Sequence, residues 1–187
     1  MNAPVYIDLG AYRGVTIARY RHSRNWKQGT RIFAWECNPY LKNVNYGVDV
    51  IRVNAAAWIC EGEMDFYVSR KAPGRVQGSS VYKEKRTGNL NIEQPVRVRT
   101  VDFSAWVISQ FIESEHVTLK MNIEGAEYDV LEHMVKTGAI EHIDTLFVQW
   151  HYKKCCIPEQ RHLDIVRALR KYSHLTLYSG YGFLYAK

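Results

Sequence analysis

The sequence lacks several features that would place the protein in a particular class. No apolar run approaches the roughly 18 residues that a transmembrane helix needs. The first residues, MNAPVYIDLGAYRG, have neither the basic start nor the long apolar segment of a signal peptide. The chain has only four cysteines, Cys37, Cys60, Cys155 and Cys156, and no CxxC pair. Because disulfide frameworks are typical of small secreted chains, we expect reduced thiols and a soluble, cytoplasmic protein.

The composition is that of an ordinary globular protein. Of 187 residues, 47% are hydrophobic and 24% are charged, which argues against disorder and suits one domain over residues 1–187. The 25 Lys and Arg residues exceed the 19 Asp and Glu residues, which gives a net charge of +6. This modest surplus permits an anionic substrate or a nucleic acid as partner but does not require either.

Short apolar runs alternate with helical patterns, which predicts an α/β fold with a mostly parallel sheet. The patterns predict a hairpin in residues 57–68 around Glu61-Gly62 and an antiparallel hairpin in residues 174–186. Residues 69–95 read as a long, basic loop, and long loops in compact domains are often functional. The predicted strands are 4–9, 31–36, 48–53, 96–101, 117–123 and 145–150, and the predicted helices are 14–27, 39–46, 102–112, 126–136 and 158–172.

A glycine turn follows the first predicted strand. Asp8, Gly10 and Gly14 form an acid-x-Gly-x-x-x-Gly pattern, which differs from both GxGxxG and the P-loop. Glycines let the backbone approach a ligand closely, and the leading acid suits a cationic cofactor without phosphate, such as S-adenosylmethionine. Glu36 ends the second strand, 28 residues after Asp8, where an acid can accept the ribose hydroxyls of adenosine. The alternative is a solvated or capping glutamate.

The segment LKMNIEGAEYDVLEHM carries the third signal. Lys120, Asn122 and Glu124 occupy alternate positions of a strand, so their side chains face the same way. Three polar side chains on one strand face are costly in a core and suit a cleft, although an edge strand with a solvated face would also accommodate them. Gly125 breaks the strand, and Glu127 lies near the start of the next helix.

These segments resemble the FkbM-type family of methyltransferases that use S-adenosylmethionine. LKMNIEGAEYDVL resembles the family signature, DLGAYRG its first cofactor motif, and FAWECNPY its second-strand segment. VNAAAWICEGEMDFYV, VRTVDFSAWV and LFVQWHY resemble later blocks, so the likeness covers about residues 5–152 in the same order. It implies a Rossmann-like class I fold with a seven-stranded, mostly parallel sheet that ends in an antiparallel hairpin.

The resemblance also implies O-methylation, often of a sugar or another small molecule, and a set of functional residues. The cofactor positions would be Asp8, Gly10, Tyr12, Gly14, Glu36, Asn38, Asn54 and Ala55. For proton removal we rank His151 first, because an unperturbed histidine titrates near neutral pH, and Glu124 second. Lys120 could stabilise the developing oxyanion and Asn122 could hold the acceptor. His151 could equally be a strand-end histidine bonded to a neighbouring loop.

Two residues depart from the family pattern. Asn122 stands where the family usually has Asp, and Gln149 stands where the fifth strand often ends in an acid. Since Asn can orient a hydroxyl but cannot take its proton, Asn122 argues against a carboxylate base or a divalent metal at that position. Glu124, Glu127 and His151 could ligate a metal, but we favour catalysis without one. The spacing of His151, Cys155 and Cys156 fits no zinc motif.

On the acceptor side, we expect Ser79, Ser80 and Glu127 to bind substrate, with the 69–95 loop lying over the acceptor. A carbohydrate or small-molecule acceptor is the leading hypothesis, with no membrane span and with a homo-oligomer left open. One alternative is a nucleic-acid (RNA) methyltransferase, which the net charge of +6 and the many aromatic residues favour, although the NPPY tetrapeptide of DNA enzymes that methylate amino groups is absent. The other is a module that binds the cofactor but has weakened catalysis.

Overall fold

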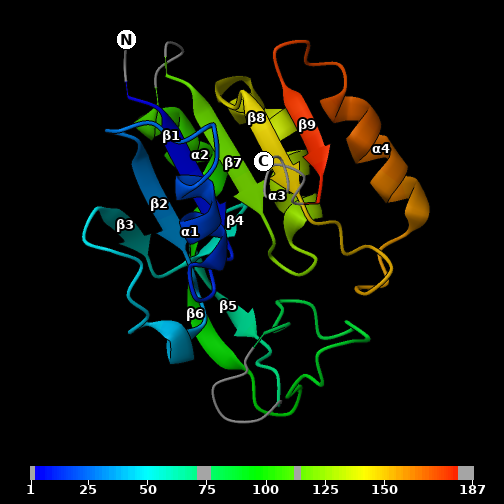
Figure 1. Cartoon of the computed structure of the whole chain (residues 1–187). Helices are drawn as coiled ribbons and strands as arrows, with labels where there is room; N and C mark the ends of the chain where they lie inside the picture. Colours follow the sequence, from blue (N-terminus) through cyan, green and yellow to red (C-terminus); the bar gives the residue numbers. More distant parts are fainter. Residues whose placement is uncertain (1–2, 71–76, 112–114, 181–187) are drawn as a thin grey trace.

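The computed structural model describes residues 3–70, 77–111 and 115–180, which form two sheets and four α-helices (Figure 1). The larger sheet has six strands in the order β3-β2-β1-β7-β8-β9, and the smaller has the order β4-β6-β5. In the larger sheet, the strands are β1 (Val5–Leu9), β2 (Arg31–Trp35), β3 (Val50–Val53), β7 (Val117–Met121), β8 (Thr145–Val148) and β9 (Thr176–Ser179). In the smaller sheet they are β4 (Ala56–Trp58), β5 (Gly62–Phe66) and β6 (Val96–Asp102).

Every neighbouring pair in the six-stranded sheet is parallel, so all carboxyl ends lie along one edge. The chain runs outward from β1 through β2 to β3 and then returns to β7 on the other side of β1. This arrangement confirms the Rossmann-like α/β expectation, and ligands of such sheets bind where the strand order reverses. β9 pairs in parallel with β8, and the second half of the expected closing hairpin lies in residues 181–187, outside the described residues.

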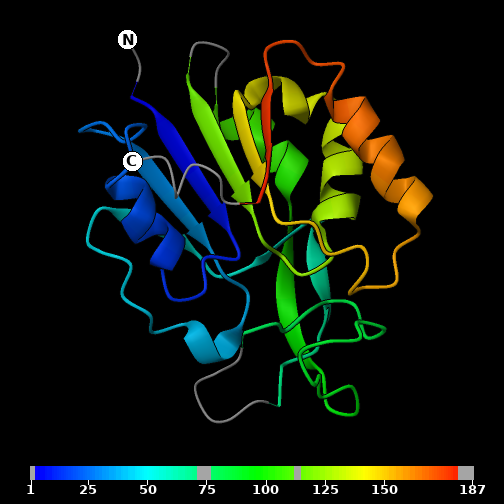
Figure 2. The same cartoon turned by 45° about the vertical axis from the view of Figure 1, so that its right-hand side comes forward.

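The helices cover the two faces of the large sheet unequally. α1 (Val15–Arg21) packs on one face, and α2 (Phe103–Gln110), α3 (Glu127–Thr137) and α4 (Glu159–Leu169) lie on the other (Figure 2). Under α1, the ring of Tyr20 stacks on Tyr6 of β1 with centroids 3.9 Å apart. Among the described residues, no helix is long and apolar enough to cross a bilayer. Two 3-10 turns, η1 (Pro39–Leu41) and η2 (Ala139–His142), complete the elements.

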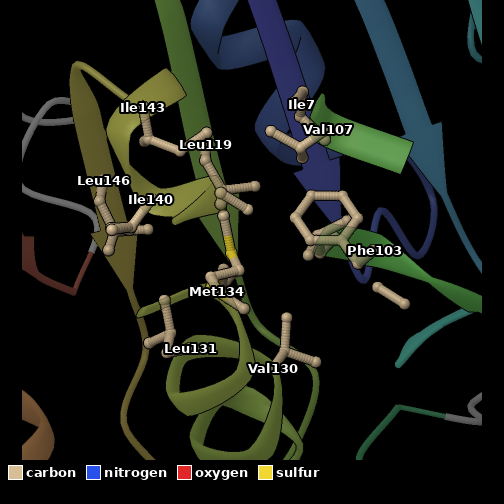
Figure 3. Packing of buried hydrophobic residues seen from close by; sticks show 14 of the residues in the cluster. Ile7, Phe103, Val107, Leu119, Val130, Leu131, Met134, Ile140, Ile143 and Leu146 are labelled. Carbon is tan, nitrogen blue, oxygen red and sulfur yellow. The ribbon is translucent and has the colours of Figure 1, made fainter. Parts of the chain in front are cut away.

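The main hydrophobic core lies between the large sheet and the helices α2 and α3 (Figure 3). Ile7 and Leu119 come from adjacent strands, and Phe103, Val107 and Met134 from the helices meet them. All five are fully buried. The packing fixes β1 beside β7, which is the pair of strands whose ends form the site.

Helix ends follow the sequence signals at Asp102, Gly138 and Pro158, whereas the helix predicted over residues 39–46 is wrong, because only the 3-10 turn η1 forms there. Asp102 caps α2 by accepting a hydrogen bond from the backbone N–H of Ala105 at 3.0 Å, as its position predicts. Gly138, with φ of 80°, ends α3 as expected, and α4 begins after Pro158. The helix predicted over residues 14–27 is shorter, because the chain turns after Arg21 and the hydroxyl of Ser23 bonds back to the carbonyl of Tyr20.

The hairpin predicted in residues 57–68 is wrong, because β4 and β5 do not pair with each other. β6 lies between them, parallel to β4 and antiparallel to β5. Opposite charges across β5 and β6 contribute to this pairing: Arg97 faces Asp65 in register, and their side chains form an ion pair at 3.0 Å. Cross-strand pairs of this kind select partners that the period of a strand does not specify.

A buried ion pair joins the two central strands of the large sheet. Asp8 of β1 and Lys120 of β7 stand opposite each other in register, and Lys120 Nζ lies 2.6 Å from Asp8 Oδ1. Neither side chain is more than 1% exposed. The hydroxyl of Thr16 donates to the other oxygen of Asp8. Charges this deeply buried are tolerated only when paired and hydrogen-bonded.

Lys120→Met should lower the free energy of unfolding by about 3–5 kcal/mol, because it leaves Asp8 buried without its cation. Urea denaturation followed by circular dichroism measures the loss. Adding Asp8→Asn to Lys120→Met should recover part of it, since the stranded charge is then removed as well. Lys136→Met, on the exposed surface of α3, is the control and should change stability by less than about 0.5 kcal/mol. A Lys120→Met protein as stable as this control would show that the pair is not needed.

Candidate functional site

A pocket of about 370 Å³ opens at the carboxyl ends of β1, β2 and β7, next to the point where the strand order reverses. Its size is within the range of small-molecule sites. Of the residues that the sequence analysis selected, nine border it: Gly10, Tyr12, Glu36, Asn38, Ala55, Ser79, Lys120, Asn122 and Glu124. The other six are not among its lining residues: Asp8, Gly14, Asn54, Ser80, Glu127 and His151.

The glycine turn forms one wall and requires glycine for steric reasons. Gly10 has φ of 75°, and a Cβ there would lie 2.2 Å from the carbonyl oxygen of Asn122. The turn passes this close because Asn122 N–H donates to the carbonyl of Leu9. Tyr12 also takes a positive φ, 49°, which is uncommon for a residue with a side chain. The predicted motif is therefore a tight backbone turn against the end of β7.

Lys120 holds this turn in place through hydrogen bonds to its carbonyl groups. Besides Asp8, its ammonium donates to the carbonyls of Gly10 at 3.0 Å and Leu9 at 3.3 Å. Three contacts match the three N–H donors of a lysine. Lys120 was expected to stabilise a developing oxyanion, but the structure places its charge on Asp8 and on the glycine turn.

Glu36 directly follows β2 and lies at the pocket wall. One oxygen accepts the N–H of Tyr12 at 2.9 Å and the other accepts the N–H of Asn38 at 2.8 Å. Burial raises the pKa of Glu36 above its usual 4.5, and these two hydrogen bonds act in the opposite direction. Asn38 in turn accepts the N–H of Tyr40 and so caps η1. The carboxylate is thus held in one position beside the glycine turn.

The far wall of the pocket is apolar. Ala55, Ala56 and Ala57 follow β3, and Phe66 of β5 joins them. Asn54, the neighbouring candidate, is exposed and bonded to Arg52, so only Ala55 of that predicted pair borders the pocket.

Several contacts hold Glu124 in a strained backbone conformation. It has φ of 54°, in the left-handed region that side chains avoid, and its carbonyl accepts bonds from Ser80 Oγ at 2.7 Å and Cys155 Sγ at 3.1 Å. Burial, aided by the charge of Glu127, raises the pKa of Cys155 to about 12, so this thiol remains a donor. Strained residues that the surroundings hold in place are typical of active sites.

A buried histidine stands behind Glu124. His151 Nδ1 lies 2.9 Å from Glu127 Oε1, and its Nε2 lies 3.6 Å from Glu124 Oε2. Because a carboxylate accepts and does not donate, Nδ1 carries the proton and Nε2 faces Glu124. Glu127 also accepts the N–H groups of Ile123 and Gly125, on either side of Glu124. His151 therefore reaches the pocket only through Glu124.

The segment 77–95, which follows β5, lies beyond the carboxyl ends of the large sheet (Figure 1). Ser79 borders the pocket, and its Oγ accepts the N–H of Ser69. Lys85, which the sequence analysis did not select, is buried and lies 3.1 Å from Glu124 Oε2. Its ammonium also donates to the carbonyls of Gly78 and Thr87. The segment is thereby fixed to the site.

Asn122 borders the pocket, and its Oδ1 is buried without a hydrogen-bond partner among the described residues. Within the same part of the chain, no three His, Cys, Asp or Glu side chains are placed to hold a metal ion. The pocket wall instead carries two acids, Glu36 and Glu124, and two cations, Arg19 and Lys120.

Comparison with known proteins agrees with this geometry. A family model described as the methyltransferase FkbM domain matches residues 8–175, from the acid of the glycine turn to the end of the segment before β9. No curated protein and no solved structure matches the chain. The matched region contains the pocket, the clamped turn at Glu124 and the buried His151. The protein belongs to the FkbM methyltransferase family.

Proposed function

We propose that the protein methylates a hydroxyl group of a sugar or another small molecule, with S-adenosylmethionine as methyl donor. The observation that carries the proposal is that two separately held carboxylates, Glu36 and Glu124, border one pocket at the switch point of the sheet. One acid suits the ribose of the cofactor, and the other suits the hydroxyl of an acceptor. Family membership supports the reaction class.

The pocket residues fit this cofactor in shape and in chemistry. The turn at Gly10 leaves room that a Cβ would fill, and the apolar wall at Ala55 and Phe66 suits a flat adenine. Glu36 would accept the ribose hydroxyls, with Tyr12 and Asn38 holding its carboxylate. Bound S-adenosylmethionine supplies an electrophilic methyl group on a positively charged sulfur.

Glu124 is the group best placed to remove the acceptor proton. It borders the pocket, whereas His151, ranked first from the sequence, is only 2% exposed and lies behind it. Glu124 would accept the hydroxyl proton as the acceptor oxygen takes up the methyl group, and the departing sulfur would keep the electron pair of the bond that breaks. His151, fixed by Glu127, would orient Glu124, and Asn122 would help to align the acceptor.

Binding of S-adenosylmethionine should weaken as the solution becomes acidic. Glu36 must be ionised to accept both ribose hydroxyls, and burial raises its pKa, so affinity should be lost from a pH above the ordinary value of 4.5. Below that raised pKa, the dissociation constant should rise about tenfold for each pH unit. Titration calorimetry across the acidic range measures it.

Glu36→Gln is the matched variant for this prediction, because it keeps the size of the side chain and cannot ionise. It should bind more weakly at neutral pH and lose the acid dependence that Glu36 causes. If wild type and Glu36→Gln respond to acid in the same way, Glu36 is not the ribose acceptor.

Glu124→Gln should reduce turnover by about 10²–10⁴-fold, the usual contribution of a general base. His151→Ala should also reduce turnover, by less, because it acts through Glu124. Both variants should bind S-adenosylmethionine within about twofold of wild type, since the cofactor residues are intact. Glu84→Gln, an exposed acid on the same segment as Lys85, is the control and should be fully active.

The assay transfers a radiolabelled methyl group to a panel of glycans, small phenols and RNA. Transfer to glycans or phenols supports the proposal, and transfer to RNA alone would show that the acceptor is RNA and not a sugar or another small molecule. Binding of cofactor without transfer to any member would favour a module with weakened catalysis. Full turnover in both Glu124→Gln and His151→Ala would refute the assigned roles.

A further inference from the structure

The positively charged side chains that line the pocket differ in whether they already have partners within the protein. The two cations on the wall, among the described residues, are Lys120 and Arg19. All three N–H donors of Lys120 are already used by Asp8 and by the carbonyls of Leu9 and Gly10. Arg19 is therefore the cation on this wall that remains for a ligand.

Arg19 lies on the face of α1 that borders the pocket. Val15, Thr16 and Arg19 all line it, and residues three and four apart share one helix face. Long helical side chains point back toward the start of the helix, which here is the glycine turn. The structure gives the exposed guanidinium of Arg19 no ion-pair partner among the described residues. Arg21 on the same helix differs, because it pairs with Asp49 and lies outside the wall.

The order of groups along the pocket determines what Arg19 can meet. The apolar wall of Ala56 and Phe66 belongs to the small sheet, which contacts α2 and α3. Glu36 directly follows β2, and Arg19 belongs to α1 on the other face of the large sheet. A ligand with adenine at the apolar wall and ribose at Glu36 would extend its amino-acid end toward α1. That end of S-adenosylmethionine carries a carboxylate.

We propose that Arg19 binds the carboxylate of the cofactor's amino-acid group and so selects cofactors that carry it. This inference rests on the proposed function, because it assumes the same cofactor in the same pocket. A guanidinium matches a carboxylate with two parallel hydrogen bonds, and such charge-assisted pairs are the stronger ones. The pairing would also leave Glu36 of the wall available for the ribose.

The test compares S-adenosylmethionine with its decarboxylated analogue by calorimetry, which needs no acceptor. Arg19→Met should weaken binding of S-adenosylmethionine about tenfold or more and change binding of the analogue less than about twofold. Arg19→Lys should keep part of the preference, since it retains the charge without the planar fork. Arg21→Met removes the same charge from the same helix outside the pocket, and it should preserve the wild-type preference.

Each result has a distinct meaning. If Arg19→Met weakens both ligands equally, or binds S-adenosylmethionine as wild type does, the assignment of Arg19 is wrong while the cofactor stands. If Arg21→Met weakens S-adenosylmethionine as much as Arg19→Met, the effect is general electrostatics and the inference also fails. If wild type binds neither ligand, the proposed cofactor itself is refuted.

Discussion

The buried ion pair between Asp8 and Lys120 is the interaction on which the site depends. It joins β1 to β7 where the strand order reverses, and the same ammonium bonds the carbonyls that begin the glycine turn. The turn then lies so close to Asn122 that no side chain fits at Gly10. The buried ammonium of Lys120 therefore fixes the bottom of the pocket and the path of the chain where it leaves β1 and β7.

Sequence reasoning was most successful where the signal is local. The parallel sheet, the glycine at position 10, the caps at Asp102 and Gly138 and the acid at Glu36 follow from neighbouring residues, and the structure has them. It was less successful with partners that are distant in the chain. β5 pairs with β6 through residues that are far apart in the chain, such as Asp65 and Arg97. Lys85 differs from nearby lysines only in the fold, where it is buried beside Glu124.

Roles were harder to assign than positions. Lys120 and Glu124 both border the pocket, but β7 ends at Met121, before the predicted strand end, so Glu124 reaches the pocket from the turn after the strand and not by alternation along it. Lys120 supports the backbone of the glycine turn. His151 was chosen for its chemistry, and only the fold shows that Glu124 stands between it and the pocket. Residue type and spacing bring candidates together, whereas burial and hydrogen-bond partners distinguish supporting from reacting groups.

The segment 77–95 is attached to the rest of the protein through the residue proposed to react. Ser80 bonds the carbonyl of Glu124, Lys85 pairs with its carboxylate, and the N–H of Arg86 donates to the carbonyl of Lys154. An enzyme engineer who wished to exchange this segment for that of a relative, in order to change the acceptor, would have to transplant these attachment points with it. A shorter or freely chosen graft would remove the contacts that hold Glu124 in place.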